Sequence, residues 1–218
     1  MRDLTPTEQR VVEGAGRAIE QYGWHGSTLE RIAGESGLSR MTLHRHGLGR
    51  EEIFALLGQA YEQDFRDAVA AACSIAAPAP VRLRSGLRAV CDTSERHLGF
   101  LVGLDDEADT RLFHESGHSR SGFISPVESV LREGIADGTF RRVPVASTAT
   151  LLVNAADRTY RHLRLAHRWA PARARGAIDL LVNGLTVSPP QDEPRGARPR
   201  RPAGRQSSTT TSRTPTSR

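Results

Sequence analysis

The sequence predicts an all-α protein, and two observations support this fold class. Apolar residues recur at helical spacing in the long ordered segments, and no segment shows the convincing alternation of polar and apolar residues that a strand requires. Capping residues and Gly or Pro breaks divide the chain into pieces of helical length. The 218 residues, 38% hydrophobic and 25% charged, have the composition of a globular protein.

The first helix is predicted to begin after Thr5 and to end at Gly23. Thr5 and Glu8 have the spacing of a capping box, in which each side chain accepts a hydrogen bond from the other residue's backbone. Pro6 stands at the first helical position, where its missing N–H costs nothing. The apolar residues that follow at helical spacing predict one buried face.

Two short helices and one long helix are predicted next. Ser27 and Glu30 repeat the capping-box spacing, so we predict that a second helix begins at Ser27. Gly37 breaks this helix, in the left-handed conformation that glycine adopts most easily. Ser39 then caps a third helix. A fourth helix is predicted over about residues 50–73.

Further helices are predicted beyond the rigid Ala-Pro repeat at residues 77–80. They cover about residues 81–98, 100–108, a segment with Pro126 in its first turn, residues 145–168 and residues 171–185. Residues 136–144 are predicted to form a turn. After Val187 the chain is rich in Pro, Arg, Ser and Thr without periodicity, which predicts disorder.

The pair of short helices has the form of a helix-turn-helix unit, in which the second helix enters the major groove of DNA. Between Ser39 and Arg50 there is no acidic residue, so the positive charge of the third helix is local. Leu43 is expected to face the core. Residues expected to contact double-stranded DNA are Arg40, Met41, Thr42, His44, Arg45 and Arg50. The alternative is a solvated surface helix, because helix–Gly–helix pairs occur in many helical proteins.

The net charge of the whole chain says little about DNA binding. From Gln191 onward there are seven Arg and two acidic residues, which gives +5 and equals the formal net charge of the chain. The arginine-rich tail could add nonspecific attraction to phosphates or have no role. The polar N-terminus shows no signal peptide and no apolar run approaches the ~20 residues of a membrane span, so we expect a cytoplasmic protein.

The N-terminal segment resembles the DNA-binding domain of the TetR family of bacterial transcriptional regulators, and the C-terminal half resembles the family more loosely. His44 stands where the family usually has Tyr, Gly47 replaces an aromatic residue, and Gly49-Arg50 replaces Ser-Lys. The resemblance adds Thr28 and Ser39 to the expected DNA contacts. Residues that match the family pattern without gaps are Gly23, Trp24, Ser27, Thr28, Ile32, Ala33, Ser36, Gly37, Leu38, Ser39, Thr42, Leu43, Arg45, His46 and Glu51.

The resemblance implies a helix-turn-helix domain over residues 1–50, a larger helical effector-binding and dimerisation domain over residues 51–187, and the tail 188–218. It implies a homodimer that acts as a repressor, is released from a palindromic operator by a small-molecule effector, and is no enzyme and needs no cofactor. Apolar residues expected to support dimerisation are Leu151, Leu152, Ile178, Leu181, Val182 and Leu185. Candidate effector contacts are Cys91, His97, Phe100, Phe113, His114, Phe123, Asn154, Asp157 and Tyr160.

Other patterns predict different functions. His114-Glu-Ser-Gly-His118 fits the H-E-x-x-H pattern of zinc hydrolases, although the Gly within it and the absence of a clear third ligand argue against a catalytic zinc. His44 and His46 point apart on a helix and are not expected to share a metal ion. Cys73 and Cys91 are expected to be buried thiols rather than a redox sensor. A protein that coats DNA without sequence preference is a third possibility.

Overall fold

The structure, a computed structural model, describes residues 4–106 and 121–187. Helices account for the regular structure in this part of the chain, which confirms the predicted all-α fold, and an isolated bridge joins Phe140 to Thr186. The helices are α1 (Pro6–Gly26), α2 (Leu29–Glu35), α3 (Arg40–Arg45), α4 (Arg50–Cys73), α5 (Ala79–Arg96), α6 (Leu98–Asp106), α8 (Ser121–Ala136), α9 (Val145–Leu165) and α10 (Pro171–Asn183).

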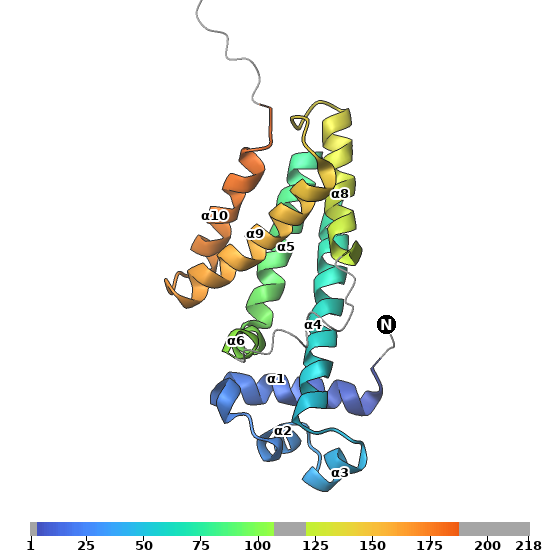
Figure 1. Cartoon of the computed structure of the whole chain (residues 1–218), viewed down its shortest axis with the longest axis vertical. Coiled ribbons are helices and arrows are strands. Elements are labelled where there is room, and N and C mark those ends of the chain that lie inside the picture. Colours follow the sequence, from blue (N-terminus) through green and yellow to red (C-terminus); the bar gives the residue numbers. More distant parts are fainter. Residues whose placement is uncertain (1–3, 107–120, 188–218) are drawn as a thin grey trace, which may run out of the picture. The chain divides into compact units, whose positions relative to one another are not determined.

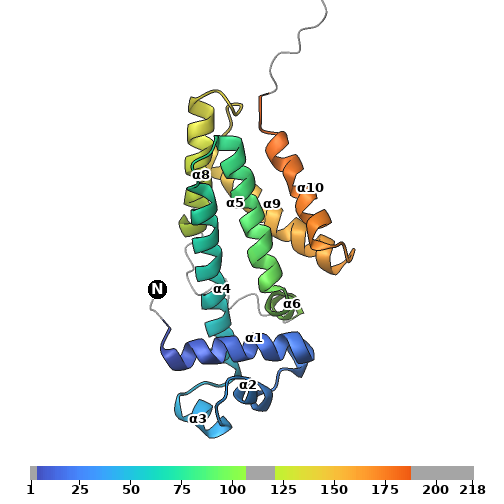
Figure 2. The ribbon, with the colours of Figure 1, turned by 180° about the vertical axis from the view of Figure 1, so that it is seen from behind.

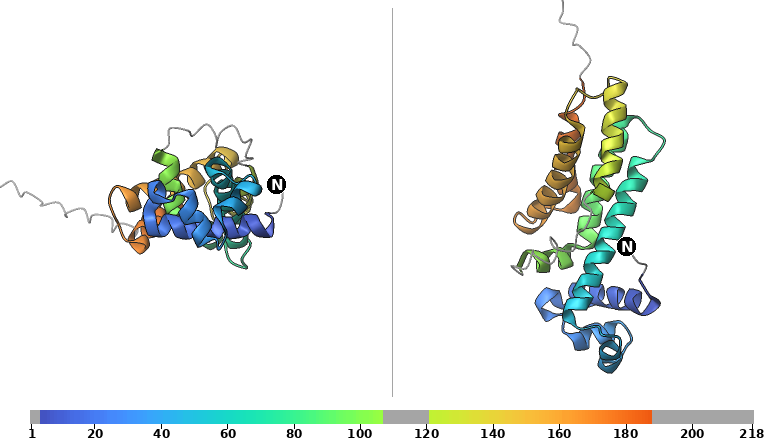
Figure 3. Two further views of the ribbon diagram at one scale, coloured as in Figure 1. Left: turned by 90° about the horizontal axis from the view of Figure 1, so that it is seen from below. Right: turned by 45° about the vertical axis from the view of Figure 1, so that its right-hand side comes forward.

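Helix α4 connects two groups of helices. Helices α1, α2 and α3 gather around its first turns, and α6 packs on α1 (Figure 1). Helices α5 and α8 lie along the rest of α4, while α9 and α10 pack on α5 (Figure 2). The right-hand view of Figure 3 shows α8 running beside α4.

Each group of helices has its own hydrophobic cluster. The N-terminal cluster runs from Val11 in α1 to Leu57 in α4, and it also takes Phe100 and Leu101 from α6. The C-terminal cluster is built from α4, α5, α8, α9 and α10. The predicted division at residue 50 thus stays a prediction, with the N-terminal cluster continuing seven residues beyond it. The tail 188–218 lies outside the described residues.

The structure corrects several predicted helix boundaries. The backbone leaves the helical conformation at Gly23, as predicted, with φ of 70° and ψ of 170°, but a further short turn carries α1 to Gly26. Pro126 lies inside α8, which begins at Ser121, and not in its first turn. Helix α5 begins at Ala79, within the Ala-Pro repeat, because proline is tolerated among the first helical residues.

Ion pairs hold α9 and α10 against α5. The guanidinium of Arg164 in α9 donates through Nε and Nη2 to the two carboxylate oxygens of Glu95, over 2.8 and 2.7 Å. These hydrogen bonds lower the pKa of the Glu95 carboxyl. Arg175 in α10 donates to Asp92 over 2.7 Å. The dimerisation helices predicted from sequence are therefore fixed to the rest of their own subunit by charge as well as by apolar packing.

Candidate nucleic-acid interface

The corner between α2 and α3 is built from one glycine and two helix caps. Gly37 has φ of +62°, the left-handed conformation predicted from sequence. Leu38 N then donates to Ala33 O over 2.9 Å and closes the turn. Ser39 caps α3 as predicted, because its Oγ accepts from Thr42 N over 3.0 Å.

The cap of α2 is Thr28, not Ser27 as predicted. Thr28 Oγ1 accepts from Arg31 N over 3.3 Å. Ser27 is buried, and its Oγ donates to Gly23 O over 2.7 Å, so it ties the end of α1 to the start of α2. The sequence offers two adjacent hydroxyls, and the one that caps α2 is that of Thr28, while that of Ser27 donates to Gly23 O.

Two arginines of α1 hold the corner in place. Arg10 Nη2 donates to Ser36 O and to Gly37 O, each over 3.0 Å. Arg17 donates to Glu35 O, and its Nε lies 3.5 Å from Glu35 Oε2. These contacts satisfy carbonyls at the C-terminal end of α2, which have no partner within the helix. Neither arginine was predicted to stabilise the corner; their separation of seven residues, which places both on one face of α1, was the available signal.

Helix α3 buries one apolar residue and exposes its polar and cationic residues. Leu43 is buried in the N-terminal cluster, whereas Arg40, His44 and Arg45 are exposed. Met41 is 74% exposed. An exposed apolar group beside cationic ones suits a base edge, where a thymine methyl offers an apolar contact. Thr42 is half-buried, and its Oγ1 lies 2.9 Å from Ser39 Oγ.

Arg40 has an acidic partner across the corner. Its Nη1 donates to Glu30 Oε1 in α2 over 2.7 Å. Both side chains face solvent, with exposures of 67% for Arg40 and 68% for Glu30. Although α3 itself carries no acidic residue, a carboxylate of α2 therefore lies at its N-terminal end.

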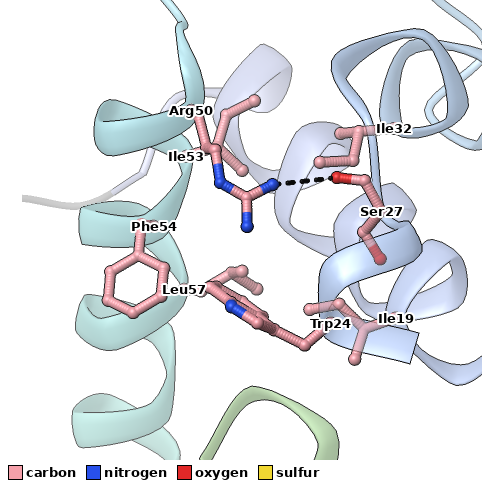
Figure 4. A pocket seen from close by; sticks show the side chains of 8 residues that line it. All are labelled: Ile19, Trp24, Ser27, Ile32, Arg50, Ile53, Phe54 and Leu57. Carbon is pink, nitrogen blue, oxygen red and sulfur yellow. Dashed lines mark hydrogen bonds between the residues drawn. The ribbon is translucent and has the colours of Figure 1, made fainter. Parts of the chain in front are cut away.

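Arg50 differs from the other predicted DNA contacts. Its Nη1 donates to Ser27 O over 3.3 Å, and its guanidinium carbon lies 5.2 Å from the centre of the Trp24 ring. Figure 4 shows this side chain over a small pocket between α1, α2 and α4 that Ile19, Ile32, Ile53, Phe54 and Leu57 also line. Arg50 thus links the first turn of α4 to the backbone just before α2, and a phosphate contact from it remains a prediction.

The predicted effector contacts do not all lie together. Cys91 and Tyr160 are buried in the C-terminal cluster, and Phe123 packs against it. Phe100 belongs instead to the N-terminal cluster, and Asn154 is exposed on α9. Phe113 and His114 lie outside the described residues.

A group of polar side chains beside the C-terminal cluster includes two predicted effector contacts, His97 and Asp157, and three residues that were not predicted, Tyr61, Ser94 and Arg161. Asp157 Oδ1 accepts from Ser94 Oγ over 2.8 Å, and Asp157 Oδ2 accepts from Arg161 Nη2 over 3.2 Å. Tyr61 lies beside this group; burial, followed by the Asp157 charge, raises the pKa of its phenol. The ring of His97 lies 5.3 Å from that of Tyr61. Ser94, Asp157 and Arg161 thus place polar atoms beside the C-terminal cluster.

Within residues 4–106 and 121–187, the structure gives no support to cysteine or metal chemistry. Cys73 and Cys91 are free and buried, and burial raises the pKa of their thiols to about 11 and about 12. Such thiols are almost wholly protonated near neutral pH and therefore unreactive. Residues 114–118, which carry the zinc-hydrolase pattern, lie outside the described residues. Among the described residues, no three His, Cys, Asp or Glu side chains are grouped so that they could hold a metal ion.

The helices of the described residues are each too short or too polar to span a bilayer.

Comparison with solved structures identifies the fold. The chain is similar to the TetR-family regulator PfmR of Thermus thermophilus, with 24% identity and a TM-score of 0.60 over 85% of this chain and all of that one. It is also similar to a putative TetR-family regulator from a Rhodococcus species, with 15% identity and a TM-score of 0.67 over 84% and 100% of the two chains. A third similar structure is the fatty acid degradation regulator FadR of Bacillus halodurans, with 16% identity and a TM-score of 0.66 over 84% and 98%.

The sequence matches no protein-family model and no curated protein. The structural matches nevertheless cover nearly the whole length of each neighbour. The chain therefore has the fold of the TetR-family transcriptional regulators, as its helix-turn-helix pattern indicated.

Proposed function

From the TetR-family fold we infer that this chain is a DNA-binding transcriptional regulator, a repressor that leaves its operator when a small molecule binds. The observation that carries this proposal is the exposed surface of α3. It presents Arg40, Met41, His44 and Arg45 to solvent while Leu43 anchors the helix from behind. In a helix-turn-helix unit, this is the surface that reads base edges in the major groove. We expect such a regulator to act in the cytoplasm, where the chromosome lies.

The proposed DNA contacts divide by chemistry. Arg40, at the first position of α3, can donate two hydrogen bonds to one guanine, which is worth about 1–3 kcal/mol of discrimination against another base. Arg45 and His44 suit phosphate oxygens, and so do the exposed hydroxyls of Thr28 and Ser39. Phosphate contacts position the helix and contribute affinity without sequence preference.

Ligand control is proposed to act through α4 and α6. Tyr61 of α4 packs against both hydrophobic clusters. Helix α6 meets α1 so closely that a methyl group on Gly103 would lie 2.0 Å from the Trp24 ring. A small molecule that favours another packing of the C-terminal cluster would therefore displace the N-terminal helices as well. It would weaken DNA binding by its differential affinity for the two arrangements.

The proposal is tested by sequencing DNA fragments that the purified protein selects from a random pool. A dimeric regulator should enrich one pseudo-palindrome, with half-sites about one helical turn or a multiple of it apart. Enrichment of no common sequence would favour a nonspecific coating protein and contradict the proposal.

Dimerisation is proposed to use the outer surfaces of α9 and α10. Leu151 of α9 is 67% exposed and Leu180 of α10 is 71% exposed, although both are large and apolar. Leu151 was expected to support dimerisation and Leu180 was not. The remaining expected residues face their own subunit: Leu152, Ile178, Val182 and Leu185 are buried, and Leu181 packs against the same cluster. Leu151 and Leu180 are therefore the residues to test for a contact with a second copy.

Replacing both Leu151 and Leu180 with aspartate should convert the dimer to a folded monomer, because four carboxylates would enter an apolar interface. Sedimentation measures the mass directly. Operator affinity should fall by about 10²–10⁴-fold, the advantage of two linked binding modules over one. Val81→Asp is the control, since Val81 is an exposed apolar residue of α5. A double variant that sediments as the wild type does would place the dimer interface elsewhere.

A further inference from the structure

The N-terminal end of α3 carries a neutralised charge. Arg40 is the first residue of α3, and Glu30 lies in the first turn of α2, ten positions earlier. The two helices meet at the Gly37 corner, which brings Arg40 Nη1 within 2.7 Å of Glu30 Oε1. Because both side chains are about two-thirds exposed, the pair stands in solvent on the surface proposed to face DNA.

An ion pair there affects guanine and phosphate differently. A guanidinium has five N–H donors in a fixed planar fork, so a carboxylate can accept on one edge while guanine O6 and N7 accept on another. Guanine is neutral and adds little repulsion toward Glu30. A phosphate carries a full negative charge and would approach Arg40 against the charge of that carboxylate.

Binding to random DNA depends almost wholly on the charges that reach phosphates. Each phosphate neutralised by a cationic side chain steepens the slope of log K against log salt by about 0.9. Arg40 makes little net contribution to that slope while Glu30 cancels its charge. In an operator, the hydrogen bonds to guanine do not require the ion pair to open.

We infer that Glu30 is a specificity-determining residue: its carboxylate directs Arg40 toward a guanine of the operator and withholds it from the phosphates of other DNA. This inference rests on the proposed function, because it requires that α3 reads bases. Glu30 acts through Arg40 and is a positioning residue, so its removal strengthens binding to the wrong DNA more than binding to the right one.

The test compares Glu30→Gln with the wild type on the selected operator and on random duplex DNA of equal length, over a series of salt concentrations. With Arg40 released to phosphates, random DNA should bind about fivefold more tightly at 0.15 M salt, and the slope should steepen by about 0.9. Operator affinity should change less than about twofold, so the preference for operator falls about threefold to fivefold.

Two controls isolate the role of the ion pair. Glu20→Gln makes the same charge change at another exposed position, on α1, and should leave the operator preference unchanged. In an Arg40→Ala background, Glu30→Gln should have no further effect on random DNA, because its partner is gone. Thermal unfolding of each variant confirms that it is folded.

The outcomes separate this inference from the proposed function. Equal strengthening on both DNAs, or an effect that persists without Arg40, would show that Glu30 only repels DNA in general and would overturn the inference. If the wild type prefers the operator over random DNA and Glu30→Gln keeps the same preference, the inference about Glu30 is overturned while the proposed function stands. A wild-type protein that does not prefer the selected DNA would overturn both.

Discussion

Gly14→Ala should destabilise the protein and impair DNA binding, because α1 and α2 meet at this glycine. A methyl group there would lie 2.1 Å from Ser36 Oγ, 2.6 Å from Ser36 N and 2.8 Å from Ser36 Cα. Two of these three atoms belong to the backbone, so no side-chain rotation relieves the clash. Overpacking of this kind costs about 1–3 kcal/mol, occasionally more. For a chain of this size, that lowers Tm by about 2–12 °C.

To relieve this clash, Ser36 must move away from α1. That displacement should weaken operator binding, because Arg10 holds the corner between α2 and α3 through Ser36 O and Gly37 O. Gly16→Ala is the matched control. Gly16 also lies in α1, and a methyl group there meets nothing within 4 Å. Since alanine favours a helix over glycine by about 0.5–1 kcal/mol, the control should be as stable as the wild type or more so. If Gly14→Ala has the same Tm and the same operator affinity as Gly16→Ala, then α1 does not pack on α2 as closely as described.

Local rules predicted the elements that depend on local chemistry. The capping box of Thr5 and Glu8 is present, with Glu8 Oε2 accepting from Thr5 N over 2.8 Å. Gly37 adopts the left-handed conformation, and Ser39 caps α3. Helix α4 has the predicted bounds. In each case the atoms that decide the structure lie within a few residues of one another, so a single sequence contains the relevant information.

Contacts between distant residues were not predicted. Phe100 stays a predicted effector contact, but its packing in the N-terminal cluster through α6 was not predicted. Glu30 and Arg40 meet only because the Gly37 corner folds α2 back toward α3. Such pairs follow from how helices pack, which periodicity alone does not define.

The candidate dimer helices show the same limit. Apolar periodicity identified Leu152 and Ile178 together with Leu151, but the first two are buried in their own subunit. Leu180, which is as apolar and more exposed, was not among the residues expected to support dimerisation. A helix that packs on its own subunit on one side and on a second copy on the other has two apolar surfaces, and spacing does not say which residue belongs to which.

The second large effect is expected from removing the charge of α3. Arg40→Ala with Arg45→Ala should weaken operator binding by about 30- to 1000-fold at 0.15 M salt. This range combines the loss of a guanine contact worth about 1–3 kcal/mol with the loss of one phosphate contact. Both side chains are exposed, so the free energy of unfolding should be nearly unchanged. A variant that is folded but binds weakly therefore reports on the interface alone.

Arg132→Ala with Arg142→Ala is the matched control. Both arginines are exposed, and both lie beyond the N-terminal helices, Arg132 in α8 and Arg142 between α8 and α9. The control removes the same formal charge from the protein. It should leave operator affinity within about twofold of the wild type, because charges more than about 10 Å from DNA are screened at 0.1 M salt.

Whether DNA contacts α3 is decided by a salt titration of operator binding by these two double variants and the wild type. If α3 lies in the DNA groove, Arg40→Ala/Arg45→Ala should lose affinity for the operator and approach the wild-type affinity for random DNA. Its slope of log K against log salt should be shallower than that of the wild type, while the control keeps the wild-type slope. Identical titrations for all three proteins would show that DNA does not contact α3.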